Sequence, residues 1–203
     1  MTKALVTGAT RAPGRAIATS LAREGWEVHA LGRDRLALDE MRGEYGIVPL
    51  AMDLTDREYV RTVAEGLEPD VLVHAAFRWP EETQFLRLAE ADIDMALEVN
   101  LSAMLHITRA ILPAMIERGR GACVMLSVDY AEANSAIERA AAGALDGFAR
   151  ALAEEVQHTG VFVHRLAVGQ PPYRRLGSDV LTLLSASGFR SQFIKNQEHG
   201  YGT

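Results

Sequence analysis

The chain has 203 residues, of which 48% are hydrophobic and 24% are charged, and its formal net charge is −6. This length suits one well-buried domain, and an acidic balance without a basic stripe excludes the usual nucleic-acid-binding surface. The short pair Arg174-Arg175 is interpreted as a solvated turn. Because Cys123 is the only cysteine and the six histidines show no ligand spacing, neither an internal disulfide nor a metal site is expected.

The chain passes directly into a strand pattern, and it contains no run of eighteen apolar residues. We therefore expect a cytoplasmic protein without a signal segment or a membrane span. A reducing compartment also agrees with Cys123, which lies in an apolar run and is expected to be a buried packing residue.

Strand-like apolar runs alternate with helical patterns along the chain, which is typical of a parallel sheet with helices on both faces. Strands are expected at 4–6, 28–31, 48–52, 70–74, 122–127 and 161–166. Helices are expected at 14–24, 35–42, 57–66, 91–117 and 135–158. The fourth of these helices is interrupted at most near Asn100, and Pro113 is expected to bend it.

A glycine-rich segment joins the first strand to the first helix, with Gly8 and Gly14 as its glycines. In that position, backbone N–H groups can approach a pyrophosphate at the positive end of a helix. Because the segment lies within a complete strand–helix–strand unit, it predicts a nucleotide-binding loop.

This loop resembles that of the classical short-chain dehydrogenase/reductase family, which reads Thr-Gly-x-x-x-Gly-x-Gly. Thr7, Gly8 and Gly14 match, whereas Ala12 replaces the middle glycine and Pro13 replaces a branched apolar residue. Ala12 is tolerated only where the backbone does not need a positive φ. Pro13 removes an N–H donor, although proline suits the first turn of a helix. The resemblance implies a dinucleotide site whose binding is weakened or lost.

The resemblance extends to the adenosine side of the site. Arg11 and Arg33 stand where the family holds the 2′-phosphate of NADP, and a guanidinium suits that dianion. This favours NADP(H) over NAD; the alternative is that both are ordinary exposed arginines. Asp53 resembles the residue of an Asp-Leu step that covers the adenine, while Asp53 or Thr55 can alternatively be a helix N-cap. The cofactor residues implied are Gly8, Thr10, Arg11, Pro13, Gly14, Arg33, Asp53, Leu54, Ala75 and Ala76.

The segment after the fourth strand departs from the family, which has Asn-Asn-Ala-Gly where this chain has 74–77. Phe77 in place of glycine is expected to crowd a ribose. His74 is interpreted as a packing residue at the strand end rather than as a catalyst.

The family's chemistry uses Asn, Ser, Tyr and Lys, with the pKa of the Tyr lowered by the Lys one helical turn further on. Asn100 matches the first of these, and its structural and catalytic roles remain alternatives. The position of the catalytic Ser holds Val128. Its neighbour Ser127 would point to the other face of the strand unless the strand bulges.

The Tyr and Lys positions hold Glu138 and Ala142, and no Tyr-x-x-x-Lys occurs in the chain. Ser135 and Glu138 form a capping-box pattern, which we favour over a replacement acid at Glu138. Tyr130 precedes this helix. The candidate catalytic residues are therefore Asn100, Ser127, Tyr130 and Glu138.

The predicted fold class is α/β: a single domain over 1–203 with a three-layer Rossmann-type fold. Its doubly wound parallel sheet would have about seven strands, with helices on both faces. After the sixth strand, the chain leads almost at once into a helix at 178–185 and a last strand at 192–194. The substrate lid of the family is thus expected to be shortened, which would exclude water poorly.

The leading functional hypothesis is a degenerate family member without hydride transfer that acts as a binding or structural subunit. Its interface would use the helices 91–117 and 135–158, through which the family forms dimers, with a second copy or an active relative as partner. The small residues 140–144 and Gly147 would allow close helix approach; alternatively, they pack within the chain.

Two enzymatic alternatives remain. The chain resembles 3-oxoacyl-carrier-protein reductases within the family. The first alternative is therefore an NADPH-dependent ketoreductase-like protein that uses the four candidate residues as unusual catalytic groups, or a lidless site open to a bulky or carrier-bound substrate. The second is a non-redox reaction with Glu138 or Asp129 as the base.

Overall fold

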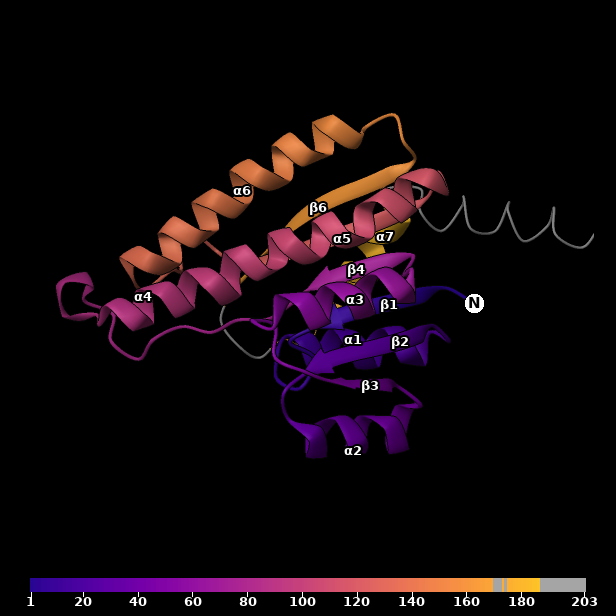
Figure 1. The fold of residues 1–203 in the computed structure, drawn as a ribbon, viewed down its shortest axis with the longest axis horizontal. Helices are drawn as coiled ribbons and strands as arrows, with labels where there is room; N and C mark the ends of the chain where they lie inside the picture. The colour runs from indigo at the N-terminus through magenta and orange to yellow at the C-terminus, as the bar shows by residue number, and fades with distance from the viewer. Residues whose placement is uncertain (170–172, 174, 187–203) are drawn as a thin grey trace, which may run out of the picture.

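The computed structural model describes residues 1–169, 173 and 175–186 (Figure 1). Its sheet has six strands in the order β3-β2-β1-β4-β5-β6, and every neighbouring pair is parallel. The expected doubly wound Rossmann-type sheet is confirmed, and the last strand predicted at 192–194 lies outside the described residues. The strands are β1 (Lys3–Thr7), β2 (Glu27–Gly32), β3 (Val48–Ala51), β4 (Val71–His74), β5 (Gly121–Val128) and β6 (Val161–Val168).

Helices cover both faces of this sheet. One face carries α1 (Gly14–Arg23), α2 (Arg35–Tyr45) and α7 (Leu176–Ala186). The other face carries α3 (Arg57–Leu67), α5 (Ala103–Glu117) and α6 (Ala136–Val156). A short 3₁₀ helix, η1 (Phe85–Arg87), and the helix α4 (Glu90–Leu97) precede α5.

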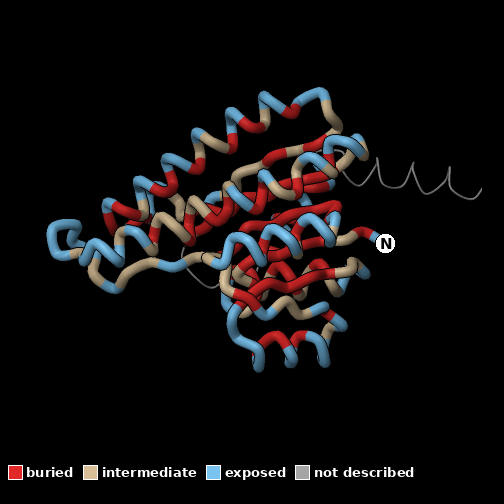
Figure 2. Tube along the Cα trace, in the orientation of Figure 1, coloured by how far each residue is buried: buried red, intermediate tan, exposed pale blue. Residues whose placement is uncertain are grey.

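Two hydrophobic cores form because each central strand is buried on both faces. Along β5, Val124 and Leu126 belong to the core under α1, α2 and α7, while Cys123 and Met125 belong to the core under α3, α5 and α6. Figure 2 shows β1, β2, β4 and β5 buried along most of their length, whereas the helices alternate between buried and exposed residues. This pattern explains why the strands read as continuous apolar runs. Cys123 is a buried packing residue as predicted, and burial raises the pKa of its thiol to about 12.

Side-chain caps set where two helices begin. The Asp34 carboxylate accepts a hydrogen bond from the Ala37 amide at 3.1 Å and starts α2. Asp56 accepts from the Tyr59 amide at 3.4 Å and starts α3. The N-cap expected at Asp53 or Thr55 was therefore wrong, because the chain makes one more turn before α3 begins.

Helices α4 and α5 are joined without a break through a π-helical segment, η2 (Glu98–Ser102), so the interruption expected near Asn100 is a local widening of the helix. By length and composition, the continuous helix Glu90–Glu117 could cross a membrane, and 50% of the relevant window is buried inside the protein. The core helix of a globular protein meets the same criteria.

The connection between β6 and α7 spans only residues 169–175. Helix α7 packs directly on α1, where a Cβ at Gly177 would lie 2.0 Å from the Ser20 Oγ. Glycine at this position permits the close approach of the two helices.

His74, at the end of β4, is fully buried as the packing role predicted. Its Nε2 lies 2.9 Å from the Thr108 Oγ1, whose own hydroxyl donates to the Met104 carbonyl at 2.9 Å. The Nε2 of His74 is therefore the donor to Thr108. Burial lowers the pKa of His74 to about 3, so the ring is neutral in the folded protein.

This burial makes stability depend on pH. Between about pH 6.5 and about pH 3, the unfolded chain binds a proton at His74 that the folded protein does not. Lowering the pH through this window should reduce the free energy of unfolding by up to about 1.4 kcal/mol per pH unit. His74→Gln keeps a donor for Thr108 but does not titrate, so its stability should fall less steeply in urea unfolding at several pH values. The control is His158→Gln at an exposed position, and equal slopes in all three proteins would contradict the assignment.

Candidate functional site

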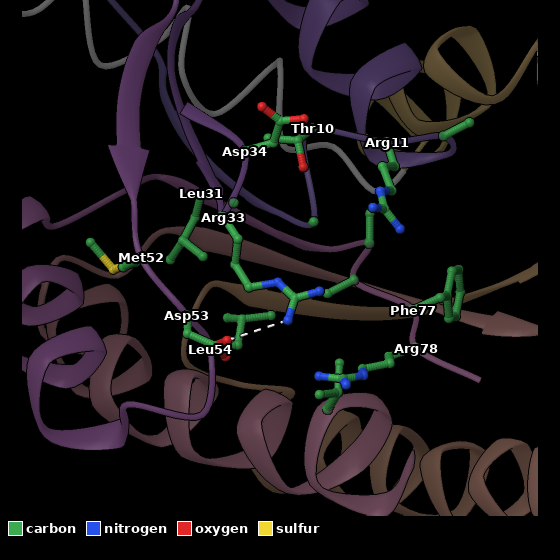
Figure 3. Close-up of a pocket in the computed structure, with 16 residues that line it drawn as sticks. Thr10, Arg11, Leu31, Arg33, Asp34, Met52, Asp53, Leu54, Phe77 and Arg78 are labelled. Carbon is green, nitrogen blue, oxygen red and sulfur yellow. Dashed lines mark hydrogen bonds and ion pairs between the residues drawn. The ribbon is translucent and has the colours of Figure 1, made fainter. Parts of the chain in front are cut away.

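A pocket of about 150 Å³ lies at the carboxyl ends of β1, β2 and β4 (Figure 3). Strand β1 pairs with β2 on one side and β4 on the other, so the pocket lies where the strand order reverses. Open α/β sheets bind ligands at this point. Most of the predicted cofactor residues line it: Gly8, Thr10, Arg11, Arg33, Asp53, Leu54, Ala75 and Ala76.

The glycines of the loop before α1 are required by close packing. Gly8 has φ +66°, and a Cβ there would lie 2.4 Å from the Ala76 Cα. A Cβ at Gly14 would lie 2.4 Å from the Gly8 carbonyl oxygen, so Gly14 packs the loop onto the start of α1 without lining the pocket. Pro13 directly precedes α1 and lines a neighbouring cavity instead.

Ala12 replaces the middle glycine of the loop at a position that does not need a positive φ. Among the described residues, Glu68 is the only non-glycine with a positive φ, so the φ of Ala12 lies outside the region that favours glycine. A methyl group at this position is therefore compatible with the φ of the loop.

Gly32, which the sequence analysis did not single out, ties the loop to the second strand. A Cβ at Gly32 would lie 2.5 Å from the Thr10 Cγ2, and the Ala9 amide donates to the Leu31 carbonyl at 3.1 Å. A glycine inside a strand often marks a close approach of backbone, and this signal could have identified it.

Three arginines from separate segments line the pocket: Arg11, Arg33 and Arg78 (Figure 3). The Arg33 Nη1 lies 3.4 Å from the Asp53 Oδ2, and both side chains are about half exposed, so their pairing is weak. In the described part of the chain, the guanidinium groups of Arg11 and Arg78 make no ion pair. The pocket thus offers positive charge to an anionic ligand. Sequence reasoning missed Arg78, because only the fold brings it beside Arg33.

Asp53 is held ionised by its surroundings. Its Oδ1 accepts from the Thr55 amide at 3.0 Å and from the Thr55 hydroxyl at 2.9 Å. Burial raises the pKa of Asp53, but these hydrogen bonds and the charge of Arg33 outweigh it and leave the pKa below its ordinary value.

Asn100 is buried and fixes the segment that carries Arg78. Its Oδ1 accepts from the Arg78 amide at 3.1 Å, and its Nδ2 donates to the carbonyls of Arg78 at 2.7 Å and Ala96 at 2.8 Å. All of these bonds go to main-chain groups. Asn100 therefore positions the wall of the pocket, and it lies in the π-helical segment η2.

A second cavity, of about 270 Å³, adjoins the first. Ala12 and Phe77 line both cavities, so the two spaces meet at these residues. Phe77 stacks on Trp79 with ring centroids 6.3 Å apart and an angle of 24° between the ring planes. The other residues of the second cavity include Val128, Glu138 and Tyr173.

Ser127 is buried and lines neither cavity. Its Oγ accepts a hydrogen bond from the Arg165 Nε at 2.8 Å. The pairing of β5 with β6 runs without a bulge from Gly121 to Val128, so Ser127 keeps the opposite face from Val128. The bulge that would have brought Ser127 into the site is absent from this strand pair.

Tyr130 lies on the surface with 56% of its area exposed, and the Arg139 guanidinium lies 5.6 Å above its ring. Tyr130 and Arg139 therefore form a cation–π pair with each other, and neither side chain lines either cavity.

Glu138 has two roles. Its amide donates to the Ser135 Oγ at 3.2 Å, which confirms the predicted cap of α6. Its carboxylate accepts a hydrogen bond from the main-chain N–H of Asn134 at 2.6 Å. In a standard capping box the donor would be the main-chain N–H of the next residue, Ser135. Of the four catalytic candidates, Glu138 is the one that lines the second cavity. Ala142, one helical turn further on, is buried.

No group of three or more metal-ligating side chains occurs among the residues that the structure describes.

Comparisons with known proteins agree with this geometry. A sequence model of the short chain dehydrogenase family matches residues 2–171. The chain is 45% identical over 118 residues to an uncharacterized short-chain type dehydrogenase/reductase, y4eK, of Sinorhizobium fredii, which covers 58% of this chain and 48% of that protein. It is 32% identical over 178 residues to the very-long-chain 3-oxoacyl-CoA reductase of Anas platyrhynchos, which covers 79% of this chain and 56% of that protein. The chain thus spans about half the length of these two relatives.

Among solved structures, a metagenomic short-chain oxidoreductase in complex with NADP superposes with a TM-score of 0.83 at 28% identity. The match covers 90% of each chain.

Proposed function

Because the chain belongs to the short chain dehydrogenase family, we propose that it binds NADP(H) in the arginine-lined pocket and lacks the family's proton-transfer groups for hydride transfer. The observation that carries this proposal is the contrast between two adjoining cavities. One presents Arg11, Arg33 and Arg78 beside a glycine loop, and the other has Glu138 where the family resemblance expects a tyrosine. NADPH can donate a hydride, but this chain would supply only binding and orientation, without a group that completes the transfer.

The donor set of the first pocket fits a phosphorylated nucleotide. The loop from Gly8 ends at the N-terminus of α1, where backbone amides favour a pyrophosphate. A 2′-phosphate would compete with Asp53 for Arg33, because hydrogen bonds to a dianion are stronger than an exposed ion pair. The carboxylate of Asp34 already caps α2. These features support NADP(H) over NAD.

The absence of hydride transfer is supported by where the candidate groups lie. Ser127 bonds to Arg165 on the other face of β5, and Tyr130 lies on the surface under Arg139. The carboxylate of Glu138 holds the Asn134 amide, and Ala142 has no amine with which to assist it. A positioned general acid contributes about 10²–10⁴-fold to a rate, so its loss would leave turnover slower by that factor.

The binding of NADPH should depend on the pocket's arginines. Arg33→Ala should weaken NADPH binding by about tenfold or more, because a hydrogen bond to a charged group is worth about 1.5–3 kcal/mol. Binding of NADH, which lacks the 2′-phosphate, should change by less than about twofold. Calorimetric titration of both cofactors measures this difference. Arg42→Ala, on the exposed side of α2, is the matched control, and equal losses for NADPH and NADH in Arg33→Ala would contradict the assignment.

We further propose that the protein acts as a subunit of an oligomer through the helices predicted at 91–117 and 135–158, which the structure forms as the continuous helix Glu90–Glu117 and as α6. Ala140, Gly143, Ala144 and Gly147 are exposed on α6, and a Cβ added at Gly143 or Gly147 would meet nothing within 4 Å. The alternative that these two glycines serve packing within the chain is not supported. A flat face of small residues would let a helix of a second copy, or of an active relative, approach closely.

Gly147→Leu tests this interface. A leucine there should separate the subunits and improve the intrinsic helix propensity, so a change in mass would not come from unfolding. Sedimentation of the purified chain, alone and mixed with a related reductase, measures the mass. Gly43→Leu, at an exposed and open position of α2, is the control. An unchanged mass in Gly147→Leu, or a monomer in every sample, would contradict the proposal.

The second candidate function is an NADPH-dependent ketoreductase that uses unusual groups. It is favoured by the position of Glu138 and Tyr173 in the cavity beside the nucleotide pocket. The shortened lid expected from the sequence would suit a bulky or carrier-bound ketone.

A further inference from the structure

The second cavity is lined by aromatic rings and a carboxylate. Three aromatic side chains, Phe77, Trp79 and Tyr173, line it together with apolar groups such as Val128. Glu138 contributes the one carboxylate among the described residues that line it, and none of them is a lysine or an arginine. Aromatic faces and a carboxylate both attract a positively charged group.

The aromatic part of this lining is held in place by stacking and by the main chain. The rings of Phe77 and Trp79 are nearly parallel, at 24° and 6.3 Å. Between them, the main chain of Arg78 is bonded in both directions by Asn100. The negative face of a ring attracts a cation, and fixed rings lose little entropy on binding.

The carboxylate of Glu138 is also fixed. It accepts the Asn134 amide at 2.6 Å, and the amide of Glu138 is bonded to the Ser135 Oγ at 3.2 Å. The charge is therefore oriented before any ligand arrives. The side chain is half-buried at the edge of the cavity.

The two cavities are arranged for one extended ligand. Arg11, Arg33 and Arg78 line the first, and the second begins at Ala12 and Phe77, which line both. A dinucleotide whose adenosine phosphates bind the arginines would pass these two residues and place its other end among the aromatic rings.

The redox state of NADP changes the charge of that end. The nicotinamide ring of NADP⁺ is a positively charged pyridinium, and the ring of NADPH is neutral, while the rest of the molecule is the same. We propose that the second cavity recognises the pyridinium and makes the protein bind NADP⁺ more tightly than NADPH. This inference rests on the proposed binding of NADP(H), and it makes the protein a sensor of the oxidised cofactor.

Calorimetric titration with NADP⁺, NADPH and adenosine 2′,5′-bisphosphate tests the inference, because the last compound reports the first pocket alone. The expected preference for NADP⁺ over NADPH is about tenfold. Glu138→Gln keeps an oxygen acceptor for the Asn134 amide and removes the charge, so it should reduce this preference to about twofold. Glu155→Gln removes the same charge from the exposed far end of α6 and should leave the preference unchanged.

Fluorescence provides a second readout. The chain has two tryptophans, so a Trp26→Phe protein reports Trp79 alone. NADP⁺ should quench this emission by stacking, and adenosine 2′,5′-bisphosphate should not.

The outcomes separate the two proposals. Equal affinities for NADP⁺ and NADPH, with no effect of Glu138→Gln on their ratio, would overturn the inference while the proposed cofactor binding stands. Binding of adenosine 2′,5′-bisphosphate as tightly as either dinucleotide, without quenching of Trp79 by NADP⁺, would also overturn it. No binding of any of the three compounds would overturn both proposals.

Discussion

The close approach of the Gly8 loop to the segment after β4 is the constraint on which the site depends. Gly8 combines a positive φ with the absence of space for a Cβ beside Ala76, and Gly14 packs in turn on the Gly8 carbonyl. These contacts bring the end of β1, the start of α1 and the end of β4 together at the point where the strand order reverses. Within this loop, Gly8 and Gly14 have no space for a Cβ, whereas Ala12 carries one at a position without a positive φ.

A second constraint joins the nucleotide pocket to its neighbour. Asn100 bonds the main chain of Arg78 in both directions, so one buried side chain fixes an arginine of the first cavity and the aromatic pair of the second. Asn100 thus has a clear structural role in a chain whose other candidate catalytic groups face away or form a cap. This role does not depend on whether the protein transfers a hydride.

The sequence predicted the sheet and its helices because two-faced burial leaves continuous apolar runs, and because glycines mark the phosphate loop. Most predicted cofactor residues gather in one pocket, as strand ends of a parallel sheet must. Three contributions were not predictable from the sequence, because each depends on which residues the fold brings together. They are the place of Arg78 in the pocket, the Phe77–Trp79 stack and the hydrogen bond from Arg165 to Ser127. The N-cap of α3 was predicted at the wrong residue because Asp53 and Asp56 both precede the helix. In the structure Asp53 forms an Asx turn with Thr55, and Asp56 caps the helix.

The central claim is that nucleotide binding persists without the family's hydride transfer. The most direct measurement saturates the purified protein with NADPH, verifies binding through the fluorescence of the cofactor, and then follows its oxidation on adding 3-oxoacyl thioesters and simple ketones. Binding without oxidation above the rate in buffer is the predicted result. Rapid oxidation that collapses in Glu138→Gln or Tyr173→Phe would contradict the claim and establish the second cavity as a reductase active site.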